Sequence, residues 1–101
     1  MTVYIAGKIT GDPDYMLKFI EAQNKLVNMG HVVLSPAVLP EGFGYDAYIR
    51  MSRAMLDECE AVCLLPDWVD SDGAQGEYGR AVAKGKQVLW FDEMPWAVVA
   101  E

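Results

Sequence analysis

Residues 61–80, AVCLLPDWVDSDGAQGEYGR, join an apolar segment to a helical one, and the rest of the chain follows the same plan. The apolar run at residues 61–65 is typical of a buried strand, and the pattern from about residue 76 to 84 predicts a helix. Glu77 then lies in the first helical turn, after the carboxyl end of a strand. In open α/β sheets this edge is where ligands bind.

The residues just before Glu77 suit an anionic ligand. Gly73 and Gly76 would let the backbone approach a ligand closely. Ser71, Gly73 and Ala74 would present backbone N–H groups at a helix N-terminus, where a phosphate binds well. Glu77 by itself has a second interpretation, as a carboxylate that only complements the helix dipole.

Composition limits the class of protein. The chain has 101 residues, of which 52% are hydrophobic, and this predicts one domain spanning residues 1–101. It has no apolar run near the ~20 residues that span a membrane, and no basic-then-apolar leader, so we expect a cytoplasmic protein without membrane contact. The net charge of −7 argues against binding of a nucleic acid polymer.

Few residues could ligate a metal or form a disulfide. Cys59 and Cys63 allow either by spacing, but two reduced core thiols are the favoured interpretation. His31 follows Gly30 at a turn and has no second histidine beside it, so we expect it to be structural or exposed. No metal and no cofactor are predicted.

Strands and helices alternate along the chain. Strands are predicted at residues 2–6, 32–34, 61–65 and 86–91, and helices at 12–30, 46–58 and about 76–84. In the first helix, Met16, Phe19, Ile20, Ala22, Leu26 and Val27 recur with a helical period. The alternation predicts a single three-layer α/β domain, flavodoxin-like or Rossmann-like, with a parallel sheet of four to five strands. Residues 94–99 would be the fifth strand or an arm on a neighbouring subunit.

The functional loops of such a sheet follow its strands. They are expected at residues 7–12, 35–45 and 66–76. Aromatic side chains in or beside them, which either stack on a base or close the core, are Phe43, Tyr45, Tyr48 and Trp68. Trp90 and Trp96 would cover either a subunit contact or the domain's own core.

Several short motifs occur in a fixed order. They are YIAGKITG at 4–11, SPA at 35–37, CEAV at 59–62, LLP at 64–66 and DSDGA at 70–74, followed by Glu77. Together they resemble the DUF4406 family, a small domain family related to the nucleoside 2-deoxyribosyltransferases and the deoxynucleoside 5′-monophosphate N-glycosidases. The resemblance extends from Tyr4 to about Val88.

The resemblance implies a covalent reaction at Glu77. This residue matches the nucleophilic carboxylate of those enzymes, which attacks the sugar C1′, releases the base and leaves a glycosyl ester. Tyr4 matches a tyrosine that orients the nucleophile; without the resemblance it could equally be an ordinary strand aromatic.

The resemblance also implies a substrate site. Its predicted residues are Gly7, Lys8, Ile9, Pro36, Tyr48, Ser71, Gly73 and Ala74. Ser71 and Gly73 match contacts to a 5′-phosphate in the monophosphate-cleaving branch, whereas the base-exchanging branch has an acidic residue at the Ser71 position. We therefore expect a nucleotide more than a nucleoside. Lys8 would add a cation to this phosphate, or it is a solvated surface lysine.

One position departs from both enzyme branches. They carry an aspartate eight residues before the acidic residue that starts the third strand, and counting back from Glu60 reaches Ser52. A serine cannot act as the acid at neutral pH. Asp67, Asp70 and Asp72 are the candidates to take its place.

Three hypotheses follow. The favoured one is cleavage or transfer at an N-glycosidic bond through Glu77, and the second is a non-catalytic protein that senses or sequesters a nucleotide. The third is a structural or interaction module with a vestigial site, against which the loop glycines and Glu77 argue. The enzyme relatives lend residues across subunits, so the resemblance implies a homodimer or a higher homo-oligomer.

Overall fold

Four parallel strands form one sheet in the computed structural model, which describes residues 1–95. The strands are β1 (Thr2–Ala6), β2 (Val32–Leu34), β3 (Ala61–Leu64) and β4 (Gln87–Trp90), in the spatial order β2-β1-β3-β4. All neighbouring pairs are parallel. The predicted α/β class and parallel sheet are confirmed.

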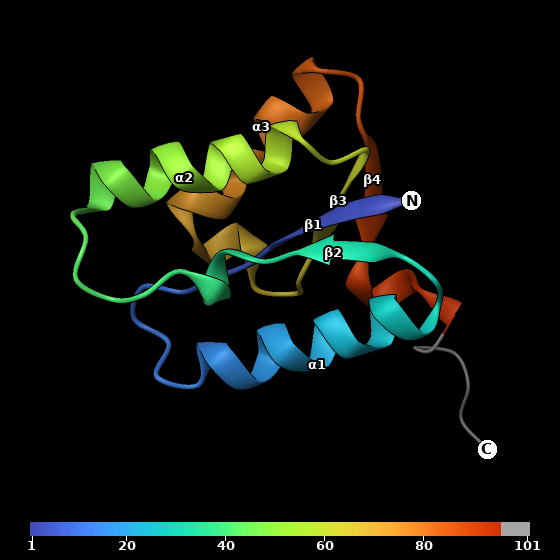
Figure 1. Cartoon of the computed structure of the whole chain (residues 1–101), viewed down its shortest axis with the longest axis horizontal. Helices are drawn as coiled ribbons and strands as arrows, with labels where there is room; N and C mark the ends of the chain where they lie inside the picture. The colour runs from blue at the N-terminus through green and yellow to red at the C-terminus, as the bar shows by residue number, and fades with distance from the viewer. Residues whose placement is uncertain (96–101) are drawn as a thin grey trace.

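Helices cover both faces of this sheet, as Figure 1 shows. The helix α1 (Tyr15–Asn28) lies on one face, and α2 (Tyr45–Asp57) and α3 (Asp72–Ala83) lie on the other. Three short 3-10 helices complete the fold: η1 (Pro36–Val38), η2 (Trp68–Asp70) and η3 (Phe91–Glu93). This is the predicted three-layer arrangement.

The alternation of side chains along β1 explains the two layers. Val3 and Ile5 point to the α1 side, where they pack with Phe19. Tyr4 and Ala6 point to the opposite side and join the cluster beneath α2 and α3. Because β1 is covered on both faces, it is apolar throughout, as buried parallel strands are.

The helix α1 buries only one apolar stripe. Phe19, Ala22 and Leu26 are buried against the sheet. Met16, Ile20 and Val27, which share the predicted helical period, are 45%, 47% and 48% exposed. The reason is geometric: a helix on a flat sheet covers it with one face, and a second apolar stripe turns to solvent.

The helix α3 begins earlier than predicted. It starts at Asp72, so Glu77 lies in its second turn and not in its first. Ser71 caps it by accepting a hydrogen bond from the Ala74 N–H at 3.1 Å. Gly73 and Gly76 are therefore helical residues and not loop glycines. The Ser71 cap stabilises the start of the helix enough to offset the low helix propensity of the two glycines.

Three aromatic rings pack together near β4. The ring centroid of Trp68 lies 4.9 Å from that of Tyr78 and 5.9 Å from that of Trp90. Trp68 and Trp90 thus cover this chain's own core. After β4 the chain forms η3, so Met94 and Pro95 are not in a strand, and the rest of the predicted fifth strand, from Trp96 on, lies outside the described residues.

Both cysteines are free and buried. His31 is half-buried at the surface, where its Nδ1 lies 3.2 Å from the N-terminal amino group. Over residues 1–95, no helix has the length and hydrophobicity that crossing a membrane requires. The same residues contain no group of His, Cys, Asp or Glu side chains that could hold a metal ion.

Candidate active site

A cavity of about 870 Å³ opens at the carboxyl edge of the sheet. The chain leaves β1 toward β2 on one side and later crosses to β3 on the other, so the order of the strands reverses between β1 and β3. Ligands of open α/β sheets bind at such a reversal. Ala6 pairs with Leu64, so both strands end at the same level and their loops begin side by side.

The structure brings the predicted substrate residues together around this cavity. The residues that line it include Gly7, Lys8, Ile9, Pro36, Tyr48, Ser71, Gly73 and Ala74, with Glu77. They come from segments that follow β1, β2 and β3. Tyr4 lies beneath this lining, in the core of the sheet.

Tyr4 and Glu77 form a buried pair. The Tyr4 hydroxyl donates a hydrogen bond of 2.6 Å to Glu77 Oε2. Tyr4 is fully buried and Glu77 is 8% exposed. Within the described residues, Oε1 of Glu77 accepts no hydrogen bond, so the protein holds one carboxylate oxygen and not the other.

Burial controls the ionisation of this pair. It raises the pKa of Glu77 to about 7, although the Tyr4 hydrogen bond and the charge of Arg53 act in the opposite direction. The pKa of Tyr4 is raised well above its usual value, first by burial and then by the negative charge of Glu77. Tyr4 therefore stays a hydrogen-bond donor while Glu77 changes its charge near neutral pH.

Ser52 occupies the place of the expected aspartate. It lies on α2, lines the cavity and is 7% exposed. Its hydroxyl also interacts with Tyr4, where it opposes the rise in the tyrosine pKa. The position is thus part of the site, but its side chain cannot supply a proton at neutral pH.

The three candidate acids differ in position. Asp67 does not line the cavity, and its carboxylate accepts hydrogen bonds from the Lys8 N–H, at 3.0 Å, and from Lys18. Asp70 and Asp72 do line the cavity. Two of the three carboxylates can therefore reach a ligand directly.

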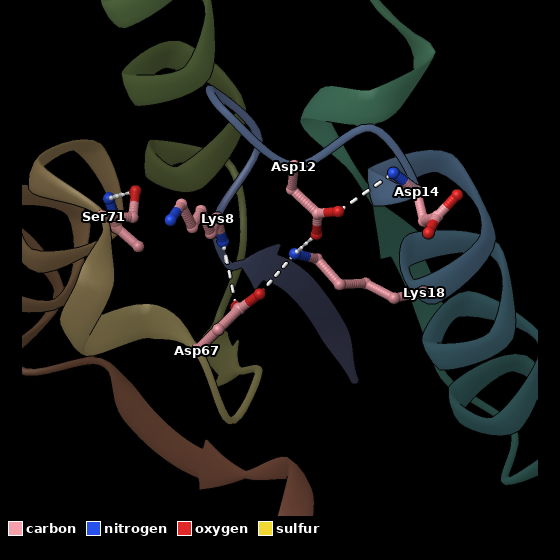
Figure 2. Close-up of polar contacts among 7 residues, drawn as sticks. Lys8, Asp12, Asp14, Lys18, Asp67 and Ser71 are labelled. Atoms are coloured by element: carbon pink, nitrogen blue, oxygen red, sulfur yellow. Dashed lines mark hydrogen bonds and ion pairs between the residues drawn. The ribbon is translucent and has the colours of Figure 1, made fainter.

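One end of the cavity favours an anion. The first-turn N–H groups of Asp72 and Gly73 have no acceptor within their helix, while that of Ala74 is taken by Ser71. The Lys8 side chain extends from the facing loop toward Ser71, as Figure 2 shows. Among the described residues, the Lys8 ammonium has no ion pair.

An aromatic wall stands on another side. The Tyr48 hydroxyl donates to the Pro40 carbonyl at 2.6 Å and accepts from the Phe43 N–H at 3.3 Å. The Phe43 and Tyr48 rings meet edge to face with centroids 6.0 Å apart. Tyr45 lines the same cavity, whereas Trp68 does not. Three of the four predicted stacking aromatics thus face the ligand space.

Sequence reasoning missed part of the lining and a second cavity. Tyr15 and Ile49 line the cavity from outside the predicted loops, whereas Thr10, Leu39 and Glu41 lie within those loops but are not among the predicted site residues. The second cavity, of about 330 Å³, lies between α2 and α3 and is lined by Arg53 and Glu77, so Glu77 is reached from two sides. The i, i+4 spacing of Ile49 and Arg53 on the helix of Ser52 was the available signal.

Comparisons with known proteins identify the family of the chain. The family described as "Domain of unknown function (DUF4406)" matches residues 1–90. No curated protein matches the chain.

Two solved structures have a similar fold. A 2-desoxiribosyltransferase from Leishmania mexicana aligns with a TM-score of 0.71 and 23% identity, over 88% of this chain and 62% of that one. A 2-deoxyribosyltransferase from the psychrotolerant bacterium Bacillus psychrosaccharolyticus aligns with a TM-score of 0.66 and 17% identity, over 89% of this chain and 71% of that one. The chain thus corresponds to less than two thirds of the Leishmania enzyme, and at these identities the likeness establishes the fold.

Proposed function

Because the chain belongs to the DUF4406 family and has the fold of two 2-deoxyribosyltransferases, we propose that it cleaves or transfers at the N-glycosidic bond of a nucleoside or nucleotide. The observation that carries this proposal is the Tyr4–Glu77 hydrogen bond at the wall of the cavity. A carboxylate at a cavity wall with one oxygen fixed and the other free of hydrogen bonds from the protein is suited to act as a nucleophile.

In the first step, Glu77 Oε1 attacks the sugar C1′. A C1′–O bond forms, the C1′–N bond breaks, and the base leaves with the bonding electron pair. The base nitrogen takes a proton from Asp70 or Asp72, which line the cavity, or from water. The Tyr4 hydrogen bond keeps the Glu77 carboxylate in one orientation throughout.

In the second step, the glycosyl ester is resolved. A water oxygen attacks C1′, the ester C1′–O bond breaks, and Glu77 leaves as a carboxylate while the water proton passes to a base or to solvent. A second nucleobase could attack in place of water, which would make the reaction a transfer. Hydrolysis is favoured over transfer because Ser71 lines the anion end of the cavity. At this position the monophosphate-cleaving branch resembles this chain, whereas the base-exchanging branch has an acidic residue.

The proposed substrate carries a 5′-phosphate. The first-turn N–H groups of α3 and the Lys8 ammonium face the same end of the cavity. The sugar would lie over Glu77 and the base against Tyr48. The cavity of about 870 Å³ has room for a mononucleotide.

The test is a chromatographic assay for free base. The protein is incubated with ribo- and deoxyribonucleosides and with their 5′-monophosphates, beside Glu77→Gln, which keeps the shape of the side chain. Release of base from a monophosphate, lost in the variant, is the expected result. Release that persists in Glu77→Gln would rule out the covalent mechanism.

A second function rests on Ser52. A site without the usual acid would bind a nucleotide and break its bond poorly, which describes a protein that senses or sequesters nucleotides. Stoichiometric binding without base release would favour this function. Ser52→Asp would then be expected to introduce base release, since it restores an ionisable group beside Tyr4.

We retain a cytoplasmic homo-oligomer as part of the proposal. The apolar side chains that remain exposed on α1 and β2 are of the kind that subunit contacts cover.

A further inference from the structure

A charged cluster joins the loops after β1 and β3, outside the cavity lining described above. Lys18, on α1, donates to the carboxylates of both Asp12 and Asp67 (Figure 2). The three side chains are 25%, 23% and 30% exposed. At that level of burial, an ion pair is screened less than one on the open surface.

A side-chain hydrogen bond of Asp67 connects the cluster to the Lys8 loop, which lines the cavity. Asp67 uses Oδ2 for Lys18 and Oδ1 for the backbone N–H of Lys8, at 3.0 Å. Lys8 is the residue whose side chain extends toward Ser71 at the anion end. A continuous chain of contacts therefore runs from Lys18 through Asp67 to Lys8.

We propose that Lys18 is a positioning residue that, through Asp67, holds the Lys8 loop so that the Lys8 ammonium meets the phosphate of the ligand. Lys18 itself does not line the cavity. It thereby determines the preference for phosphorylated over unphosphorylated ligands. The ligand class in this inference rests on the proposed function, whereas the positioning of Lys8 does not.

The charge balance explains why a cation is needed at this place. Without Lys18, the carboxylates of Asp12 and Asp67 would face each other with no cation between them. Their repulsion would separate the two loops and release the Lys8 N–H from Asp67. Lys8 would then lose its fixed position even though its own side chain is unchanged.

The experiment uses two probes that do not depend on the base, 2-deoxyribose 5-phosphate and 2-deoxyribose. Their affinities are measured by NMR titration of the full chain, for the wild type, Lys18→Met and Lys18→Arg. Lys25→Met is the matched control, because Lys25 lies on the same helix and pairs with Glu21 at 3.9 Å, away from the cavity. Hydrogen exchange of the Lys8 amide is recorded for every variant.

In Lys18→Met, the affinity for 2-deoxyribose 5-phosphate should fall about tenfold, as the loss of one charge-assisted contact predicts. The affinity for 2-deoxyribose should stay unchanged, and the Lys8 amide should exchange about tenfold faster as its protected state opens more often. Lys18→Arg should retain both properties, because the arginine keeps the charge between the two acids. Lys25→Met should behave as the wild type.

Unchanged phosphate affinity together with unchanged Lys8 exchange in Lys18→Met would overturn the inference. If the wild type binds neither probe, the proposed function fails, and the Lys8 exchange rate alone then decides whether Lys18 positions the loop. If Lys18→Met does not fold, Asp67→Ala removes the same connection and should give the same exchange rate increase. Slow Lys8 exchange in Asp67→Ala would contradict the inference.

Discussion

Glu77 is held at the border between its charged and neutral forms. Burial raises its pKa to about 7, and the short hydrogen bond from Tyr4 limits that rise. A nucleophile must be ionised, whereas a carboxylate in an apolar setting favours its proton. The two residues therefore have to be considered as one unit.

Activity should depend on this ionisation. Base release is expected to rise with pH and to level off above about 7, because only the Glu77 carboxylate attacks C1′. Tyr4→Phe should move the midpoint upward, since it removes a hydrogen bond that lowers the pKa of Glu77. Profiles of kcat/KM against pH for both proteins check this. A midpoint that moves downward in Tyr4→Phe would contradict the assignment.

The folding stability should also depend on the ionisation of Glu77, but it should fall with rising pH where activity rises. The folded pKa of Glu77 is raised from 4.5 to about 7, so its contribution is full below 4.5 and is lost as the pH rises through about 7. Over that window, the wild type should lose about 3 kcal/mol of unfolding free energy relative to Glu77→Gln. Urea unfolding of both proteins at several pH values measures this difference. Parallel curves would mean that Glu77 titrates normally.

At this scale, sequence reasoning named residues that the structure brings together, but it could not predict their burial or their ionisation. The resemblance selected Glu77 and Tyr4, and the structure puts them in contact. The extent of their burial depends on α2, which is distant in sequence, so no local pattern could predict it. The ion pair between Lys18 and Asp67 could not be predicted either, because the two residues are distant in sequence.

At the scale of elements, the N-terminus of α3 is the decisive feature. Its cap and its free N–H groups lie in one turn, because the Ser71 side chain accepts a hydrogen bond from the Ala74 N–H and leaves those of Asp72 and Gly73 free. The same serine therefore stabilises the helix and leaves space for an anion. These two roles can be separated by substitution.

Ser71→Asp should keep the cap and change the ligand. Aspartate caps a helix as well as serine does, so the melting temperature should change little. Its carboxylate would repel a 5′-phosphate, and the preference for monophosphate over nucleoside should fall at least about tenfold. Ratios of kcat/KM for the two substrates measure this preference. Ser71→Thr, which stays neutral, is the control and should leave the ratio unchanged.

Gly7 is required by the close approach of two loops. A Cβ there would lie 2.7 Å from Leu65 Cδ1 and 3.0 Å from Leu65 Cβ. Gly7→Ala should therefore destabilise the protein by about 1–3 kcal/mol. Gly79→Ala is the matched control, because a Cβ at this exposed helical position meets nothing, and it should stabilise by about 0.5–1 kcal/mol. Thermal unfolding of both variants tests the contrast.

The strands were easier to predict than the helix ends. Short apolar runs bounded by Gly, Pro or charged residues fixed β1 and β2 to the residue. The start of α3 was placed too late because Gly73 and Gly76 resemble a loop, while the cap that extends the helix is a single side-chain contact. The low helix propensity of the two glycines favoured a loop and the Ser71 cap favoured a helix, and the structure has the helix.

For the molecule as a whole, several large apolar side chains stay exposed on α1 and β2. On α1, Leu17 is 70% exposed and Ile20 is 47% exposed, and on the edge strand β2, Val32 is 67% exposed. Exposed apolar side chains that gather into a patch are commonly covered in an assembly. The sequence pattern revealed these residues as apolar but not that the sheet would leave them outside.

Sedimentation velocity should therefore give the mass of two or more chains. Ile20→Glu is expected to shift the protein toward the monomer, because it places a charge in the contact. Ala83→Glu, at an exposed site on α3 in the opposite layer, should leave the mass unchanged. A wild type that sediments as a monomer at all concentrations would end the homo-oligomer hypothesis.

The cavity has walls of two kinds, and this has an evolutionary consequence. Glu77 and Tyr4 belong to regular elements, whereas residues 39–44, which include Phe43, form an exposed connection between η1 and α2. Substitutions in such a connection change folding stability little. On the proposed function, the base lies against Tyr48 on α2, and the Phe43 ring of this connection meets the Tyr48 ring. Substitution of Phe43 can then change base preference among descendants of one gene while Glu77 and Tyr4 are inherited unchanged. Selection on recognition and selection on chemistry would act on separate parts of the chain.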